Sequence, residues 1–259
     1  MSVNGEKTVL VTGASSGFGE AIAKRMAGHG HKVILAARRL DRLSKLAKNL
    51  GEDRAHALRM DVTDRCQVVD AINELPSQFS SIDILVNNAG LALGLAPAHE
   101  VDATDWDGML ETNCRGVMNV THAVLPGMVR RRVGHVINIG SVAGTYPYIG
   151  GNVYGATKAF VRQFSLNLRS DLHGTGLRVT SVEPGLCGGT EFSSIRFKGD
   201  DKRAASMYEG MIPILPDDVA ESVYWAASQP DHVNINAIEV MPVDQSFAPL
   251  QVHRSNSSV

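Results

Sequence analysis

Seven short apolar runs alternate with longer helical segments along this chain, and this alternation limits the folds open to it. Most of the runs are continuously apolar, which is typical of strands covered on both faces, and the segments between them are long enough for crossover helices. The sequence therefore predicts an α/β fold in which a seven-stranded, doubly wound parallel sheet carries helices on both faces. The expected strands are 8–13, 32–38, 55–62, 82–90, 134–141, 177–185 and 236–243.

The chain shows no sign of a second domain. Its 259 residues suit one large α/β domain with a buried core, and no repeat, low-complexity tract or linker interrupts them. We therefore expect a single domain over residues 1–259. Two parts look irregular: residues 186–216, rich in glycine and charge and expected to form a substrate lid, and a polar tail at about 245–259.

Composition excludes several classes of function. A net charge of −2 and an isoelectric point near 6.5 give no electrostatic reason to expect nucleic acid or an anionic membrane as a partner. The three cysteines are odd in number and lack a CxxC pair, and the nine histidines show no HExxH or comparable pair, so neither a disulfide framework nor a metal site is expected. No apolar run resembles a signal peptide or a membrane span. These features predict a cytoplasmic protein.

The first chemical signal is a glycine-rich turn between the first strand and a helix, VLVTGASSGFG. Glycines there let backbone N–H groups approach a phosphate at the positive end of the helix dipole. The spacing is TGxxxGxG instead of GxGxxG, and strand-to-helix turns need glycine for other reasons, which is the competing interpretation. The predicted cofactor-binding residues of this turn are Gly13, Ser15, Ser16, Gly17, Phe18 and Gly19.

Two arginines end the second strand, and they favour NADP over NAD. Proteins that prefer NAD usually place a carboxylate there to accept the ribose hydroxyls. Arg38 and Arg39 stand at that point instead, and a guanidinium fork suits a 2′-phosphate. Alternatively, these residues and Arg42 belong to a solvated helix start, and the neighbouring Asp41 weakens the preference.

Two further turns end at the carboxyl edge of the sheet, where open α/β sheets bind ligands. Asp61 and Val62 close the third strand, and Asn88, Ala89 and Gly90 close the fourth. Because aspartate, asparagine and glycine are also common turn residues, each turn alone is weak support for the site.

Tyr154 and Lys158 lie four residues apart in GNVYGATKAF and therefore share one helical face. A nearby ammonium favours phenolate, so Lys158 is expected to lower the pKa of Tyr154 toward the working pH of a general acid or base. Ser141, at the end of the fifth strand, is expected to hydrogen-bond the same substrate oxygen. The alternative is a helix with an exposed lysine and a packed tyrosine. The apolar set expected on roughly the opposite side is Phe160, Phe164, Leu168 and Leu172.

A polar residue interrupts the apolar face of a helix expected over about 105–130, opened by a Thr104/Asp107 capping box. Asn113 is that residue. A buried amide needs partners, which are either a water linked to Lys158, giving a proton path, or local structural hydrogen bonds. The inward stripe consists of Met109, Asn113, Val117, Thr121, Val124 and Met128.

The segment TEFSSIRFKGDDKR, residues 190–203, follows the loop after the sixth strand and is expected to lie over the cleft. It carries four basic residues, Arg196, Lys198, Lys202 and Arg203. Arg196 is our candidate for binding a substrate carboxylate, because its planar fork suits that group. A solvated lid residue is the alternative, and Arg254 in the tail is a second candidate.

Together, TGASSGFG, NNAG, Asn113, Ser141, YGATK and the PG pair at 184–185 resemble the classical short-chain dehydrogenase/reductase family over essentially the whole chain. The resemblance implies a Rossmann-type domain and a nicotinamide cofactor. It also implies that Tyr154 is the acid/base, that Lys158 lowers its pKa and binds the ribose, that Ser141 orients substrate and that Asn113 anchors a proton relay. By the same implication Pro184, Gly185, Gly189 and Thr190 pass the nicotinamide carboxamide, and the helices carrying Asn113 and Tyr154 build a homotetramer.

Within that family, NNAGLALG, GNVYGATKAFVRQFSLNLR, EPGLCGGTEFS and HVNIN are similar to the NADP-dependent 3-hydroxy acid dehydrogenases, also called L-allo-threonine or serine dehydrogenases. This similarity implies oxidation of the 3-hydroxyl of L-serine, L-allo-threonine, 3-hydroxypropionate or 3-hydroxyisobutyrate, and the reverse reduction of semialdehydes. Two alternatives stay open: an NADPH-dependent reductase of a bulkier carbonyl such as a 3-oxoacyl thioester, and an NADPH sensor without turnover.

Overall fold

The computed structural model describes residues 5–247, and its centre is one sheet of seven parallel strands in the order β3-β2-β1-β4-β5-β6-β7. The predicted strand number and direction are confirmed, and each strand is shorter than its apolar run because the run continues into the turn that follows. The strands are β1 (Thr8–Thr12), β2 (Lys32–Ala37), β3 (Ala55–Arg59), β4 (Ile84–Asn87), β5 (His135–Ile139), β6 (Arg178–Pro184) and β7 (Ala237–Val240).

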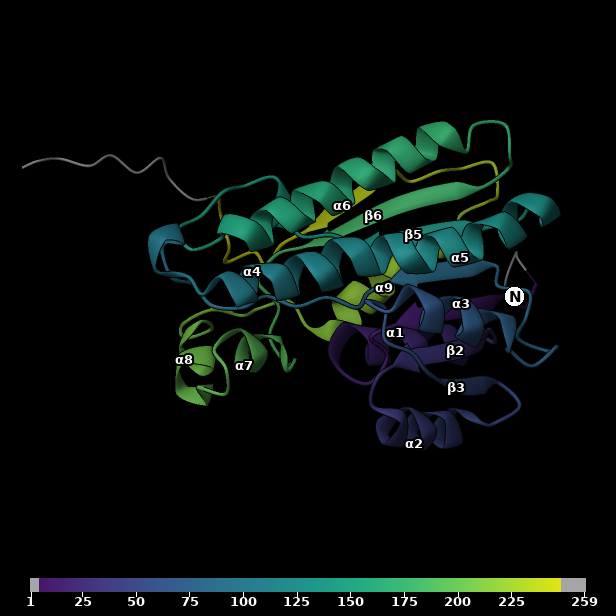
Figure 1. Cartoon of the computed structure of the whole chain (residues 1–259), viewed down its shortest axis with the longest axis horizontal. Helices are drawn as coiled ribbons and strands as arrows, with labels where there is room; N and C mark the ends of the chain where they lie inside the picture. Colours follow the sequence, from purple (N-terminus) through teal and green to yellow (C-terminus); the bar gives the residue numbers. More distant parts are fainter. Residues whose placement is uncertain (1–4, 248–259) are drawn as a thin grey trace, which may run out of the picture.

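Helices cover both faces of the sheet, with α4, α5 and α6 together on the face turned toward the viewer in Figure 1. The helices α7 and α8 stand apart at one end of the molecule. The helices are α1 (Gly17–Gly28), α2 (Leu40–Leu50), α3 (Arg65–Asn73), α4 (Ala103–Leu110), α5 (Gly116–Arg131), α6 (Asn152–Asp171), α7 (Phe192–Arg196), α8 (Asp201–Ser206) and α9 (Pro216–Ser228).

Two apolar cores flank the sheet, one on each face. On one face Ile22 of α1, Leu43 of α2 and Val223 of α9 pack against the strands and are fully buried. On the other face α3, α5 and α6 bury their apolar side chains, among them Val124 and Leu168. Burial on both sides is why the strands read as continuous apolar runs and not as alternating ones.

The strand order reverses beside β1, which pairs with β2 on one side and with β4 on the other. The chain winds to one side of the sheet through β2 and β3 and then to the other side from β4 onward. In an open parallel sheet, such a switch point leaves a crevice at the carboxyl ends of the strands.

The helix predicted over about 105–130 is divided, and its predicted capping box is wrong. α4 and α5 are joined by a π-helical turn, Glu111–Arg115, which inserts an extra residue into the hydrogen-bond ladder. The N-cap is Asp102, whose carboxylate accepts hydrogen bonds from the Thr104 N–H at 2.9 Å and the Thr104 hydroxyl at 2.8 Å. The Asp102 carboxylate caps the Thr104 N–H, so the helix begins two residues earlier than it would with Thr104 as the N-cap. The predicted inward stripe is confirmed, because all six of its members are buried.

The expected apolar face of α6 was also wrong. Tyr154 and Lys158 lie on its buried face, in line with Val161, Ser165 and Leu168, while Phe160 and Phe164 are only partly buried. Each helical residue turns by about 100°, so a set of residues at four-residue steps drifts around the axis. That drift carries Leu168 and Leu172 back to the face of Tyr154.

The segment between β6 and α9 lies against the loop after β4. The Gly94 N–H donates to the Arg196 carbonyl at 2.8 Å, and Lys198 pairs with Asp105 at 2.9 Å. This is the segment predicted as a lid, whereas residues 248–259 of the predicted tail lie outside the described residues. Among residues 5–247, no helix has the length and apolar character that crossing a bilayer requires.

Candidate active site

A cleft of about 730 Å³ opens at the carboxyl edge of the sheet and brings most of the predicted site residues together. Gly19, Asn113 and Gly189 do not line it. The predicted residues in its walls are Gly13, Ser15, Ser16, Gly17, Phe18, Arg38, Arg39, Asp61, Val62, Asn88, Ala89, Gly90, Ser141, Tyr154, Lys158, Pro184, Gly185, Thr190 and Arg196.

The glycine-rich turn has no room for a side chain at two of its glycines, Gly13 and Gly19. Gly13 has φ +67°, and a Cβ there would lie 2.9 Å from Asn88 Nδ2. A Cβ on Gly19 would collide with the Gly13 carbonyl. The missing side chains let the turn pack closely against the loop after β4, and the start of α1 lines the cleft, where a pyrophosphate can bind at a helix N-terminus.

Side chains of the neighbouring turns hold the strand ends together. The Thr12 hydroxyl oxygen accepts hydrogen bonds from the N–H groups of Asn88 at 2.9 Å and Ala89 at 3.0 Å, and Asn88 Nδ2 donates to the Thr12 carbonyl at 2.9 Å. Asp61 accepts from the Thr63 N–H at 3.0 Å and its hydroxyl at 2.8 Å. Asn88 and Asp61 thus shape the edge of the cleft in addition to lining it.

Arg39 lies at the mouth of the glycine-rich turn, with its guanidinium engaged by three residues. Nε and Nη2 donate to Ser15 Oγ at 3.1 and 3.0 Å, and Nη2 donates to Ser16 Oγ at 2.8 Å. Nη1 donates to the Glu191 carboxylate at 2.9 Å. Arg38 is exposed beside it. The structure therefore places both predicted arginines at the end of the cleft formed by β2 and the glycine-rich turn.

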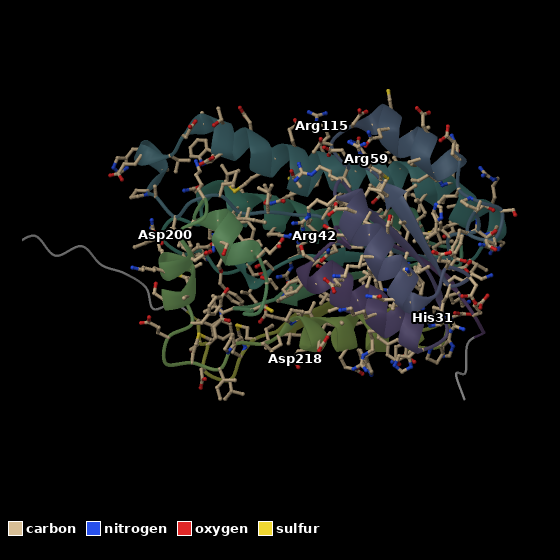
Figure 2. All side chains as sticks on the ribbon, turned by 90° about the horizontal axis from the view of Figure 1, so that it is seen from below. His31, Arg42, Arg59, Arg115, Asp200 and Asp218 are labelled. Atoms are coloured by element: carbon tan, nitrogen blue, oxygen red, sulfur yellow. The ribbon has the colours of Figure 1, made fainter. Side chains whose placement is uncertain are left out.

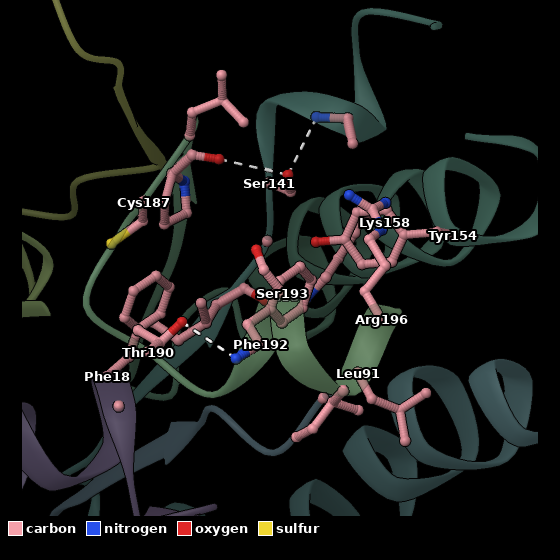
Figure 3. Close-up of a pocket in the computed structure, with 18 of the residues that line it drawn as sticks. Phe18, Leu91, Ser141, Tyr154, Lys158, Cys187, Thr190, Phe192, Ser193 and Arg196 are labelled. Atoms are coloured by element: carbon pink, nitrogen blue, oxygen red, sulfur yellow. Dashed lines mark hydrogen bonds between the residues drawn. The ribbon is translucent and has the colours of Figure 1, made fainter. Parts of the chain in front are cut away.

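Tyr154 lies at the opposite end of the cleft, nine-tenths buried on α6. Burial raises the pKa of its phenol to about 12, and the Ser141 hydroxyl and the Arg196 guanidinium oppose that rise. The net change is therefore a raised pKa, the opposite of the lowering predicted from Lys158, because burial outweighs the nearby ammonium. Figure 3 shows Ser141, Tyr154 and Arg196 around the same part of the cleft.

Lys158 is buried beneath the cleft without an ion pair among the described residues. Its ammonium donates to the Ile139 carbonyl at 2.8 Å and lies 5.9 Å from the centroid of the Tyr154 ring. Burial lowers the pKa of Lys158 from 10.5 to about 8. Because the Lys158 ammonium is desolvated, it can bind an electron-rich oxygen of a ligand in the cleft.

Replacing Lys158 with methionine is expected to raise the free energy of unfolding at neutral pH by roughly 1 to 2 kcal/mol. The depressed pKa corresponds to a penalty of roughly 3 kcal/mol for the buried charge, and loss of the hydrogen bond to Ile139 offsets part of the gain. Denaturant unfolding of both proteins measures the difference.

The pH dependence of that difference is an internal check. The folded protein releases the Lys158 proton near pH 8 and the unfolded chain near pH 10.5, so the penalty is full below pH 8 and declines between these values. Exposed Lys202 provides the control, and its replacement by methionine should change stability by less than about 0.5 kcal/mol. A Lys158→Met protein less stable than the parent would contradict the account.

Asn113 forms local hydrogen bonds, which is one of the two arrangements that the sequence predicts for its buried amide. Its Nδ2 donates to the Leu91 carbonyl at 2.8 Å and to the Thr157 hydroxyl at 3.0 Å, and its Oδ1 accepts from the Leu91 N–H at 2.9 Å. The amide thereby joins the loop after β4 to α6 and fixes the helix that carries Tyr154.

Ser141 follows β5, and its hydroxyl is positioned by backbone groups. It donates to the Pro184 carbonyl at 3.3 Å and accepts from the Ala143 N–H at 3.1 Å. The bond to Pro184 is long for a hydroxyl donor, so this proton can turn to a ligand oxygen in the cleft. Ser141 therefore joins the ends of β5 and β6 next to Tyr154.

Arg196 ends α7 and points its guanidinium into the cleft, where it is nine-tenths buried. Its Cζ lies 5.1 Å from the centroid of the Tyr154 ring, and Nη2 donates to the Tyr148 hydroxyl at 2.5 Å. Its Nε has no hydrogen-bond partner within the described part of the chain. A buried cation with an unused N–H, directly beside the tyrosine, is the arrangement expected of an anion site.

Several cleft residues were missed from the sequence. Tyr148 comes from the loop after β5, and Glu191 immediately precedes α7. Ser193 and Tyr208 hydrogen-bond to each other at 2.6 Å within the 186–216 segment, and both line the cleft. No spacing signal marks these residues, because each acts through a partner that is distant in sequence.

The fold and the cleft match one family. Residues 7–200 match the model of that family, described as short chain dehydrogenase. The chain belongs to the short-chain dehydrogenase family.

Individual relatives are similar over nearly the whole length. NADP-dependent 3-hydroxy acid dehydrogenase YdfG of Salmonella typhi is 60% identical over 247 residues, which cover 95% of this chain and 99% of that protein. Serine 3-dehydrogenase of Agrobacterium fabrum is 53% identical over 249 residues, covering 96% and 99%. A solved structure described as the closed form of serine dehydrogenase complexed with NADP+ superposes with a TM-score of 0.94 at 57% identity, covering 95% of this chain and 99% of that one.

Proposed function

We propose that this protein is an NADP-dependent oxidoreductase acting on the CH–OH group of small 3-hydroxy acids, with L-allo-threonine, L-serine, 3-hydroxypropionate and 3-hydroxyisobutyrate as the substrate class, and with reduction of semialdehydes as the reverse reaction. The observation that carries the proposal is the buried Arg196 guanidinium 5.1 Å from the Tyr154 ring. An acid/base tyrosine beside an anion site suits a substrate with a hydroxyl and a carboxylate. The names of the similar proteins support the same substrate class.

The residues of the cleft fit NADP. The glycine-rich turn suits the pyrophosphate, and Arg38 and Arg39 with the Ser15 and Ser16 hydroxyls suit a 2′-phosphate. The turns at 61–62 and 88–90 also line the cleft. Pro184, Gly185 and Thr190, which line it, and Gly189, which does not, are proposed for the nicotinamide end. When bound, NADP supplies the carbon that accepts or donates hydride.

The proposed mechanism assigns one task to each polar residue near Tyr154. Tyr154 takes the proton from the substrate hydroxyl in oxidation and returns it in reduction. Ser141 donates a hydrogen bond to the same oxygen, and Lys158 binds the nicotinamide ribose. Asn113 is a positioning residue, because its amide fixes the loop after β4 against α6. A proton relay anchored on Asn113 stays part of the proposal.

The pH dependence follows from the raised pKa of Tyr154. Oxidation needs the phenolate, whose fraction grows with pH below the pKa of about 12, so kcat/KM for oxidation should rise across the neutral and alkaline range. Reduction needs the phenol, which is fully protonated there. Initial rates of NADPH oxidation with malonic semialdehyde should accordingly show no matching increase. An oxidation profile that is flat with pH would contradict the assignment of Tyr154.

Further parts of the proposal concern assembly and location. Residues 186–216 form the proposed substrate lid, because they carry Arg196 and lie over the cleft.

We propose a homotetramer built through α5 and α6, which expose Met118 and Leu166. Three free cysteines support a cytoplasmic location. Analytical ultracentrifugation tests the assembly, and a monomer at micromolar concentration would contradict it.

A further inference from the structure

The carboxylate of Glu191 lies between two arginines, Arg39 and Arg42, at the end of the cleft formed by β2 and the glycine-rich turn. Glu191 accepts a hydrogen bond from Arg39 Nη1 at 2.9 Å with one oxygen and from Arg42 Nη1 at 2.7 Å with the other. Figure 2 shows Arg42 between the purple amino-terminal helices and the green segment that holds α7 and α8. These pairs lower the pKa of Glu191 from 4.5 to about 2, so it remains ionised at any working pH.

The Arg39 guanidinium is already hydrogen-bonded at each of the nitrogens through which a second anion would bind it. Ser15 and Ser16 engage Nε and Nη2, and Glu191 engages Nη1, so all three guanidinium nitrogens already have partners. Thr190, directly before Glu191, lies close to the glycine-rich turn, since a Cβ on Gly17 would lie 3.3 Å from its methyl group. A phosphate bound at these arginines would lie near the ionised carboxylate and share its partners.

We propose that Glu191 is a specificity-determining residue that competes with the 2′-phosphate of the cofactor for Arg39 and Arg42. The inference rests on the proposed function, in which Arg39 receives that phosphate. A 2′-phosphorylated nucleotide must replace the carboxylate on the arginines, whereas a nucleotide with a free 2′-hydroxyl leaves both ion pairs intact. Glu191 therefore lowers affinity for the first class of nucleotide and leaves the second unchanged.

The test is calorimetric binding of adenosine 2′,5′-bisphosphate and of ADP, so that no turnover is needed. Glu191→Gln should bind the 2′,5′-bisphosphate about three- to tenfold more tightly than the parent, because two half-exposed ion pairs no longer compete. Its affinity for ADP should stay within about twofold. The gain should shrink as salt is added, since exposed charges are screened.

Exposed Glu209 in the same segment provides a control with the same change of net charge. Glu209→Gln should bind both nucleotides like the parent. The inference is overturned if Glu191→Gln binds the 2′,5′-bisphosphate equally or more weakly, which would make Glu191 a support for the arginines, or if both variants gain alike. If neither the parent nor Glu191→Gln prefers the 2′,5′-bisphosphate over ADP, the cofactor assignment itself is overturned, and the inference with it.

Discussion

Replacing Tyr154 with phenylalanine should lower kcat/KM for 3-hydroxy acid oxidation by about 10²- to 10⁴-fold, the usual contribution of a positioned acid or base. The phenol is nine-tenths buried, and Tyr148, another phenol that lines the cleft, already accepts a hydrogen bond from Arg196. Steady-state kinetics measure the loss.

The variant should retain cofactor affinity within about threefold, because only a hydroxyl is removed. Tyr224→Phe is the matched control: Tyr224 stacks on His29 with 3.8 Å between ring centroids, and it does not line the cleft. The control should keep parental kinetics. Full turnover by Tyr154→Phe would show that Tyr154 is not the acid/base.

Replacing Arg196 with methionine should reduce kcat/KM for 3-hydroxy acids by about 30- to 1,000-fold, mostly through KM. Loss of a buried charged partner costs about 2 to 4 kcal/mol, which corresponds to that range. An uncharged secondary alcohol lacks the carboxylate, so its kcat/KM should fall much less, by about threefold or less. Arg196→Lys keeps the charge and loses the planar fork, so its kcat/KM for 3-hydroxy acids should lie between those of the parent and of Arg196→Met.

Arg203→Met is the control for this substitution, because Arg203 belongs to the same segment and stacks on Phe197 at 4.6 Å without lining the cleft. It should leave the kinetics with acids unchanged. Equal losses for acids and for the uncharged alcohol in Arg196→Met would remove the carboxylate assignment and leave a structural role beside Tyr148.

The parts of the fold that were predictable depend on local pattern. Each buried parallel strand is a continuous apolar run, and the spacing of Tyr154 and Lys158 within one helix fixes their shared face. Local pattern was less decisive at helix ends, where Asp102 and Thr104 both suit an N-cap. It also failed along α6, where a stripe at four-residue steps drifts from one face to another.

The electrostatics of the site were not predictable in the same way. The pKa of Tyr154 depends on how far the fold buries it, and this burial outweighs the nearby lysine, whose ammonium bonds the Ile139 carbonyl. Glu191 and Arg39 are in contact although 152 positions separate them in the sequence, and Arg196 and Tyr148 are in contact across a separation of 48 positions. Such pairs form only when the 186–216 segment folds over the sheet edge, which no spacing rule anticipates.

The most direct test is nicotinamide absorbance with the purified protein, NADP+ or NAD+, and a panel of small 3-hydroxy acids, beside an uncharged secondary alcohol and a 3-oxoacyl thioester with NADPH. The account predicts turnover of the acids with NADP+, with kcat/KM at least about tenfold above that with NAD+, which corresponds to about 1.4 kcal/mol for the contacts of the 2′-phosphate. Turnover only with the thioester or the uncharged alcohol, or an equal rate with NAD+, would contradict it.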